Sequence, residues 1–323
     1  MFWEKEGKLI YSYDGETVCI EAWGKDALRV RATKNRSFTG RDWALEAKDA
    51  HAGEVEIFED PSAKGGAFAN MYEGTDTSYG KITNGKLHAV IDSGSVITFY
   101  HEDGRVLLKE HFRRLRDEES MPLNIMGREY SNGVGDNFRI VTRFVARKGE
   151  KIFGMGQYQQ HELDLKGCML ELAQRNSQVS VPFYLSSIGY GFLWNNPGVG
   201  QVMFANNGTE WVTESGKEID YLVIAGDTPA EIEENYMTLT GKPPMMPEYG
   251  MGFWQCKLRY WNQEQLLSVA RKYKELGIPL DVIIVDFFHW TKQGEFKFDP
   301  KYWPDVPGTV SYTHLTLPTN SLV

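Results

Sequence analysis

One carboxylate interrupts an apolar stretch near the carboxyl end of the sequence. Asp286 follows the run IPLDVIIV, residues 278–285, and precedes Phe287, Phe288 and Trp290. A carboxylate that leaves water destabilises a fold unless it is paired, hydrogen-bonded or used for binding. Sugars present hydroxyls at the rim of the ring and C–H faces that stack on aromatic side chains. We therefore interpret these four residues as a candidate sugar site.

A second set of candidate binding residues comes earlier in the chain. Residues 248–255 (EYGMGFWQ) predict a short apolar strand, and Lys257, Arg259 and Tyr260 follow it. Residues 262–277 (NQEQLLSVARKYKELG) predict an amphipathic helix, after which the run LDVIIVD predicts a strand buried on both faces. A strand, helix and strand in this order predict a parallel pair. The carboxyl ends of such strands assemble sites, so the two sets of residues should meet.

A purely structural role remains open for each of these residues. Asp286 could cap the turn that follows it, or pair with Lys257 or Arg259 to hold the loops. The aromatic residues could simply be core, because most aromatic clusters are.

The elements that precede this unit predict a separate domain. Residues 1–241 contain short alternating strands and turn signals such as Asn84-Gly85 and Asn207-Gly208, which predict an antiparallel β-sandwich. Residues 227–241 (DTPAEIEENYMTLTG) predict a helix that ends this domain. The proline-rich residues 242–247 predict a linker, and residues 248–309 form the strand and helix domain. Residues 310–323 form a separate tail.

Composition excludes several classes of function. The net charge of −9 argues against binding nucleic acid, whose phosphates need clustered Lys and Arg. The sequence has no apolar segment long enough for a membrane span and no signal-peptide pattern, so we expect a cytoplasmic protein. The three cysteines, Cys19, Cys168 and Cys256, lack metal-ligand spacing and are expected to be buried, inert thiols. We expect no metal and no cofactor.

The residues around the candidate site resemble a known family. GMGFWQCKLRY and GIPLDVIIVDFFHWTKQGEFKFDPKYWPD resemble the start of the catalytic barrel of glycoside hydrolase family 31, most like its α-xylosidase branch. Three upstream segments, at residues 151–160, 181–196 and 218–232, resemble the amino-terminal domain of that family. The resemblance implies a galactose-mutarotase-like sandwich followed by the first units of a (β/α)8 TIM barrel.

The resemblance also implies an activity. The family contains retaining, exo-acting enzymes that remove an α-linked sugar from the nonreducing ends of oligosaccharides. The resemblance to the α-xylosidase branch implies that this sugar is xylose. Asp286 would bind sugar hydroxyls in the cleavage subsite, Phe287 and Phe288 would line it, and the loop from Lys257 to Trp261 would form its rim. Phe287 would fill the space that the hydroxymethyl group of glucose needs, a discrimination of only ~1–3 kcal/mol. An α-glucosidase of the same family is therefore the close alternative.

The catalytic carboxylates of the family are not expected in this chain. Retaining hydrolysis needs a nucleophile and an acid/base, which the family supplies from later barrel strands. Residues 248–309 provide only about two of the eight units of a barrel. Residues 310–323 resemble the translation of a sequencing-library adapter. We therefore expect an amino-terminal fragment that is inactive by itself.

Two other functions stay open. One is a non-catalytic carbohydrate-binding sandwich, in which Asp286 has no role. The other is a mutarotase-like epimerase, for which His161 and His88 are the available histidines. The oligomeric state is left open, and oligosaccharides are the expected partners.

Overall fold

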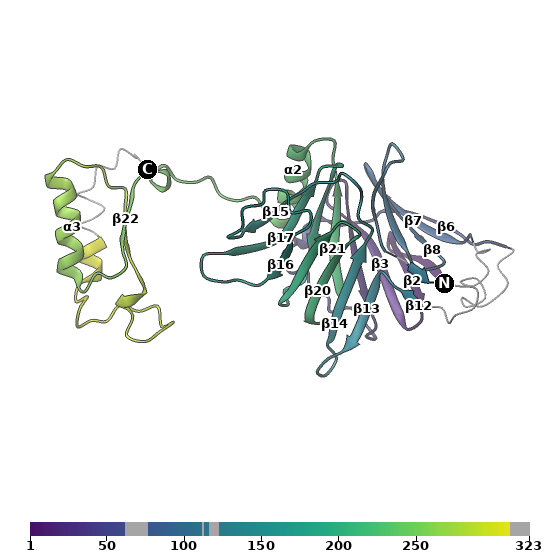
Figure 1. Ribbon diagram of the computed structural model, residues 1–323, viewed down its shortest axis with the longest axis horizontal. Helices are drawn as coiled ribbons and strands as arrows, with labels where there is room; N and C mark the ends of the chain where they lie inside the picture. The colour runs from purple at the N-terminus through teal and green to yellow at the C-terminus, as the bar shows by residue number, and fades with distance from the viewer. Residues whose placement is uncertain (62–76, 112, 116–122, 311–323) are drawn as a thin grey trace. The chain divides into compact units, whose positions relative to one another are not determined.

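The computed structural model describes residues 1–61, 77–111, 113–115 and 123–310. The chain divides into two compact units, one from Met1 to Lys242 and one that begins at Pro243 (Figure 1). Each unit is described by itself.

The first unit is built on a large antiparallel sheet. Within the described residues this sheet has nine strands, in the order β1-β2-β3-β4-β21-β18-β17-β15 with β5 paired to β3. The strands are β1 (Phe2–Lys5), β2 (Lys8–Tyr13), β3 (Glu16–Trp23), β4 (Ala27–Thr33), β5 (Ala50–His51), β15 (Ile152–Gln157), β17 (Val179–Ser186), β18 (Tyr190–Trp194) and β21 (Ile219–Ala225).

Two five-stranded sheets form the opposite layer in the described part of the chain. One has the order β10-β9-β8-β7-β6 and the other the order β13-β14-β20-β19-β16. Their strands are β6 (Glu54–Phe58), β7 (Tyr79–Asn84), β8 (Leu87–Asp92), β9 (Ile97–His101), β10 (Val106–Lys109), β13 (Arg128–Asn132), β14 (Phe138–Phe144), β16 (Met169–Leu172), β19 (Gly200–Ala205) and β20 (Gly208–Gly216). An antiparallel bridge between Glu110, which follows β10, and Phe144, the last residue of β14, links the two sheets. A short hairpin, β11 (Arg113–Leu115) with β12 (Leu123–Ile125), completes the unit.

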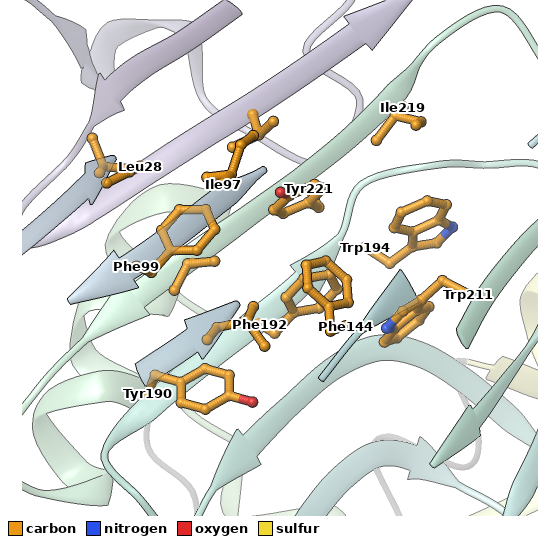
Figure 2. Close-up of a cluster of buried hydrophobic side chains, with 14 of the residues drawn as sticks. Leu28, Ile97, Phe99, Phe144, Tyr190, Phe192, Trp194, Trp211, Ile219 and Tyr221 are labelled. Atoms are coloured by element: carbon orange, nitrogen blue, oxygen red, sulfur yellow. The ribbon is translucent and has the colours of Figure 1, made fainter. Parts of the chain in front are cut away.

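The core lies between these layers. In β8 every second side chain is buried, as the alternation of the sequence predicts for a strand with one face on the core. Phe99, Phe144, Phe192 and Tyr221 come from both layers and pack ring against ring in the centre, mostly edge to face (Figure 2). This arrangement confirms the predicted antiparallel sandwich.

The helix that ends the first unit covers the outer face of the large sheet. Helix α2 (Pro229–Thr240) begins after Thr228, whose hydroxyl accepts from the backbone N–H of Glu231, and ends at Gly241. Ile232 and Leu239 pack with outward-facing sheet residues such as Leu222. Strand β21 is buried on both faces for this reason.

A buried ion pair also lies in the large sheet. Arg29 on β4 and Asp220 on β21 are both fully buried. The guanidinium donates from Nε to Oδ1 at 3.0 Å and from Nη2 to Oδ2 at 2.6 Å. Asn195 donates to the same Oδ2 at 2.9 Å. The carboxylate therefore accepts three hydrogen bonds in place of water.

The second unit contains the strand, helix and strand that the sequence predicts. Strand β22 (Trp254–Lys257) pairs in parallel with β23 (Val282–Val285), and helix α3 (Gln263–Glu275) connects them. The side chain of Asn262 caps α3 by accepting from the N–H of Gln265 at 2.9 Å. The structure also has short 3-10 helices, η1 (Ala47–Asp49) in the first unit and η2 (Glu248–Met251) and η3 (Phe287–His289) in the second, and residues 306–310 are helical.

Two details of the second unit differ from the prediction. Residues 248–251 form η2 instead of strand, so β22 begins only at Trp254. Strand β23 is half-buried along its length, whereas its sequence predicts burial on both faces. Two parallel strands and one long helix form the start of a barrel, and the described residues contain no closed barrel.

Other expectations fall outside these elements. The predicted tail lies outside the described residues, except for Val310. Among the helices of the described chain, none is long and apolar enough to cross a membrane. The cysteine prediction holds only for Cys19, because Cys168 is half-buried and Cys256 is exposed.

Candidate functional site

The register of the parallel pair sets the geometry of the candidate site. Lys257, the last residue of β22, lies opposite Val285, the last residue of β23. The chain therefore leaves both strands at the same level, with Asp286 on one strand end and the loop from Leu258 on the other. The predicted meeting of the two strand ends is confirmed.

Asp286 begins the 3-10 helix η3. Its Oδ1 accepts a hydrogen bond from the N–H of Phe287 at 2.7 Å. The side chain is half-buried, so the carboxylate does not leave water completely. Within the described residues Oδ2 accepts no hydrogen bond, and no ion pair joins Asp286 to Lys257 or Arg259. The capping role that the sequence left open is present, and the ion pair is not.

Arg259 connects the two strand ends through an aromatic ring. Its guanidinium carbon lies 3.6 Å from the ring centroid of Phe288 and 4.5 Å from that of Trp261. Cation–π contacts of this kind contribute ~0.5–1 kcal/mol at exposed positions. The guanidinium of Arg259 therefore packs on Phe288 and does not pair with the carboxylate of Asp286.

The aromatic residues after Asp286 form one partly exposed surface. Phe287 and Phe288 stack with ring centroids 4.1 Å apart, and 37% and 36% of their surfaces are exposed. Trp290 lies 6.0 Å from Phe287 and 4.6 Å from Phe296, ring to ring. Phe296 is an additional ring of this surface, and its place in the apolar–polar alternation GEFKF is the signal in the sequence that could have found it. These rings are partly exposed, so they are not only core residues.

Tyr260 and Lys257 behave differently from their neighbours. Tyr260 is buried at 2% exposure in a cluster with Leu266 and Trp303, and its hydroxyl accepts from Nε2 of Gln255 at 3.3 Å. The prediction that Tyr260 lies on the rim of the substrate site is therefore wrong, because its ring is buried in this cluster. Lys257 is exposed, and its ammonium group forms no ion pair among the described residues.

The remaining aspartates of the barrel unit have local structural contacts. Asp281 precedes β23, is exposed and accepts from the N–H of Phe253 at 2.8 Å. Asp299 and Asp305 accept from the N–H groups of Lys301 and Gly308, both at 2.9 Å. Among the described residues no group of three His, Cys, Asp or Glu side chains could hold a metal ion.

The two histidines of the epimerase alternative are not placed for acid–base chemistry. His88 on β8 stacks on Tyr100 with ring centroids 5.1 Å apart. Burial, followed by the charge of Lys81, lowers the pKa of His88. His161 is exposed, and no described carboxylate pairs with either histidine.

Comparison with known protein families matches both units. Residues 17–202 match the glycosyl hydrolase 31 N-terminal galactose mutarotase-like domain. Residues 243–318 match the glycosyl hydrolases family 31 TIM-barrel domain. The two units are thus those that the resemblance implies.

Relatives and solved structures agree with these domains. An uncharacterized family 31 glucosidase of Pseudescherichia vulneris is 41% identical over 313 residues, which are 94% of this chain and 56% of that protein. An α-xylosidase of Saccharolobus solfataricus is 36% identical over 188 residues, 55% of this chain and 26% of that protein. A solved α-xylosidase from a soil metagenome, in complex with xylose, is 41% identical with a TM-score of 0.84 and covers 98% of this chain and 46% of its own.

The chain thus spans about half the length of the first of these relatives and of the solved structure. The matches cover both units and reach most of the sequence. The chain belongs to glycoside hydrolase family 31.

Proposed function

We propose that the chain forms part of a retaining, exo-acting α-glycoside hydrolase that releases α-linked xylose from the nonreducing ends of oligosaccharides. The observation that supports this proposal is the half-buried carboxylate of Asp286 at a strand end, beside the exposed rings of Phe287 and Phe288. Solved and curated relatives named α-xylosidases support the choice of sugar.

The residues at the strand ends have separate roles in this proposal. Oδ2 of Asp286 accepts hydrogen bonds from sugar hydroxyls, because only Oδ1 is occupied by the N–H of Phe287. Phe288, held between Arg259 and Phe287, supports the ring of Phe287 and presents its exposed edge to the sugar. Phe287 occupies the space beside the pyranose where glucose carries its hydroxymethyl group. Trp290 completes the aromatic wall, and Lys257 lies at its edge.

The catalytic pair is proposed to come from barrel strands that follow β23. Retaining enzymes need two carboxyl groups about 5–5.5 Å apart. Asp281, Asp299 and Asp305 each accept a hydrogen bond from a backbone N–H that organises a turn or strand start. We therefore expect the 323-residue chain alone to release no p-nitrophenol from p-nitrophenyl α-D-xyloside.

A chimera tests the proposed sugar preference. Residues 1–309 of this chain are joined to the carboxyl-terminal part of the Pseudescherichia vulneris relative that follows the aligned region. We expect this chimera to hydrolyse p-nitrophenyl α-D-xyloside with a higher kcat/KM than the matching glucoside. Replacing Phe287 by alanine should shift the ratio toward the glucoside by about tenfold, because excluding one small group contributes ~1–3 kcal/mol.

A matched substitution controls for the loss of an exposed ring. Phe58, which is 42% exposed on β6, has an exposure close to that of Phe287, so Phe58→Ala should leave the ratio unchanged. An unchanged ratio in Phe287→Ala would show that this ring does not select the sugar. A folded chimera that prefers the glucoside would favour the α-glucosidase alternative, which the name of the 41%-identical relative supports.

A further inference from the structure

The sandwich unit has two surface hollows that meet at Trp43. One has a volume of about 590 Å³ and the other about 650 Å³, and both are lined by Trp43, Asn196 and Pro197. Volumes of ~300–1,000 Å³ are typical of ligand pockets in proteins. The two hollows lie on either side of these shared residues, and together they are called the Trp43 groove here.

Trp43 presents an exposed ring from an unfavourable backbone conformation. Its φ is 54°, and 44% of its surface is exposed. A left-handed conformation costs a non-glycine residue ~1–2 kcal/mol. Strained residues persist where surrounding contacts determine them, and they cluster at ligand clamps.

The contacts that hold Trp43 come from buried residues on either side. Nη1 of Arg29 donates to Oδ1 of Asp42 at 2.8 Å, and Asn195 donates to the carbonyl of Asp42 at 3.1 Å. The N–H of Ala44 donates to Oδ1 of Asn195 at 3.3 Å. The two neighbours of Trp43 are thus tied to the buried pair of Arg29 and Asp220. The indole is held in the groove by the sandwich core and not by burial of its own ring.

Hydrogen-bond donors lie beside this ring. Arg41 and Arg36 line the larger hollow, and neither has an ion-pair partner among the described residues. The guanidinium carbon of Arg41 lies 5.2 Å from the ring centroid of Trp43. Each guanidinium has five N–H donors, which suit hydroxyl oxygens. Tyr236 and Pro182 contribute apolar surface to the smaller hollow.

We propose that the Trp43 groove binds an oligosaccharide chain. One pyranose stacks its C–H face on the indole of Trp43, and neighbouring units extend into the two hollows. Their hydroxyls accept hydrogen bonds from Arg36 and Arg41. This site belongs to the sandwich and does not rest on the function proposed for Asp286.

Calorimetric titration of the 323-residue chain with xylohexaose and with maltohexaose tests the proposal. We expect saturable binding of at least one of them. Trp43→Gly should weaken that binding at least about tenfold, because an aromatic ring that the bound ligand covers contributes a large share of the binding energy. Glycine accepts the φ of 54°, so this variant keeps the fold, as thermal unfolding would verify. Trp43→Phe should retain part of the affinity.

Two controls separate this groove from other sites. Trp3 on β1 is 38% exposed and lines neither hollow, so Trp3→Ala should bind like the parent. Phe58→Ala, which removes an exposed ring that lines neither hollow, should also leave this binding unchanged. The proposal is overturned if neither oligosaccharide binds at up to about 10 mM. It is also overturned if folded Trp43→Gly binds with the parent affinity, or if Asp286→Asn alone removes the binding.

Discussion

Substitutions of Asp286 can separate its role as a cap from its proposed role in binding sugar. In the parent, Oδ1 of Asp286 accepts from the N–H of Phe287 at 2.7 Å. Asparagine keeps an oxygen for this N–H but loses the charge. Alanine loses both. A hydrogen bond to a charged group contributes ~1.5–3 kcal/mol and is about twice as strong as a neutral one. Two sugar hydroxyls on this carboxylate would therefore lose ~2–3 kcal/mol in Asp286→Asn, which is a fall of about 30- to 150-fold in kcat/KM.

Stability and activity should respond differently in the two variants. The assay is kcat/KM for p-nitrophenyl α-D-xyloside in the chimera described above, with thermal unfolding measured on the same samples. Asp286→Asn should unfold like the parent, whereas Asp286→Ala should lose ~1 kcal/mol of stability with its cap. Asp299, which accepts from the N–H of Lys301 at 2.9 Å in the same unit, provides the control. Asp299→Asn should keep kcat/KM within about twofold. If Asp286→Asn were as active as the parent, Asp286 would be a cap only and the reasoning would be refuted.

Three further predictions concern the sandwich. Asp220→Ala removes the fully buried carboxylate partner of Arg29, which keeps its contact with Asp42, and should lower the free energy of unfolding, measured in urea, by ~3–5 kcal/mol. The double variant with Arg29→Met should recover most of this loss. Because the pKa of His88 is lowered in the folded state, stability should fall as pH drops below ~6.5 toward that lowered pKa, and His88→Gln should weaken this dependence in pH-dependent melts. At Gly156, φ is 93° and an added Cβ would collide with the carbonyl oxygen of Val179. Gly156→Ala should therefore lower the free energy of unfolding by ~1–3 kcal/mol, and an unchanged melting temperature would contradict this.

The sandwich could be predicted because its signals are local. Period-two alternation identified β8, and Asn84-Gly85 marked the hairpin between β7 and β8. The order of the strands within each sheet could not be predicted, because it depends on pairings between strands that are far apart in the sequence, such as β4 with β21. The pair of Arg29 and Asp220, 191 residues apart, results from that same pairing.

The barrel unit shows where local patterns fail. The apolar run from Glu248 suggested a strand, but the segment turns as a 3-10 helix after Pro247. Tyr260 lies in a polar loop that suggested a substrate rim, yet it packs against Trp303, more than 40 residues later. Only the tertiary fold decides whether an aromatic residue in a loop turns inward or outward.

The position of Arg259 bears most directly on whether Asp286 is only structural. If the loops at the two strand ends were held together by an ion pair, a guanidinium would lie on the carboxylate. Instead Arg259 lies 3.6 Å from the ring centroid of Phe288, and the carboxylate has one oxygen on the N–H of Phe287. The loops are thus already connected without the charge of Asp286. A half-buried acceptor whose charge the local structure does not use supports the proposal that a hydrogen-bond donor, such as a sugar hydroxyl, binds there.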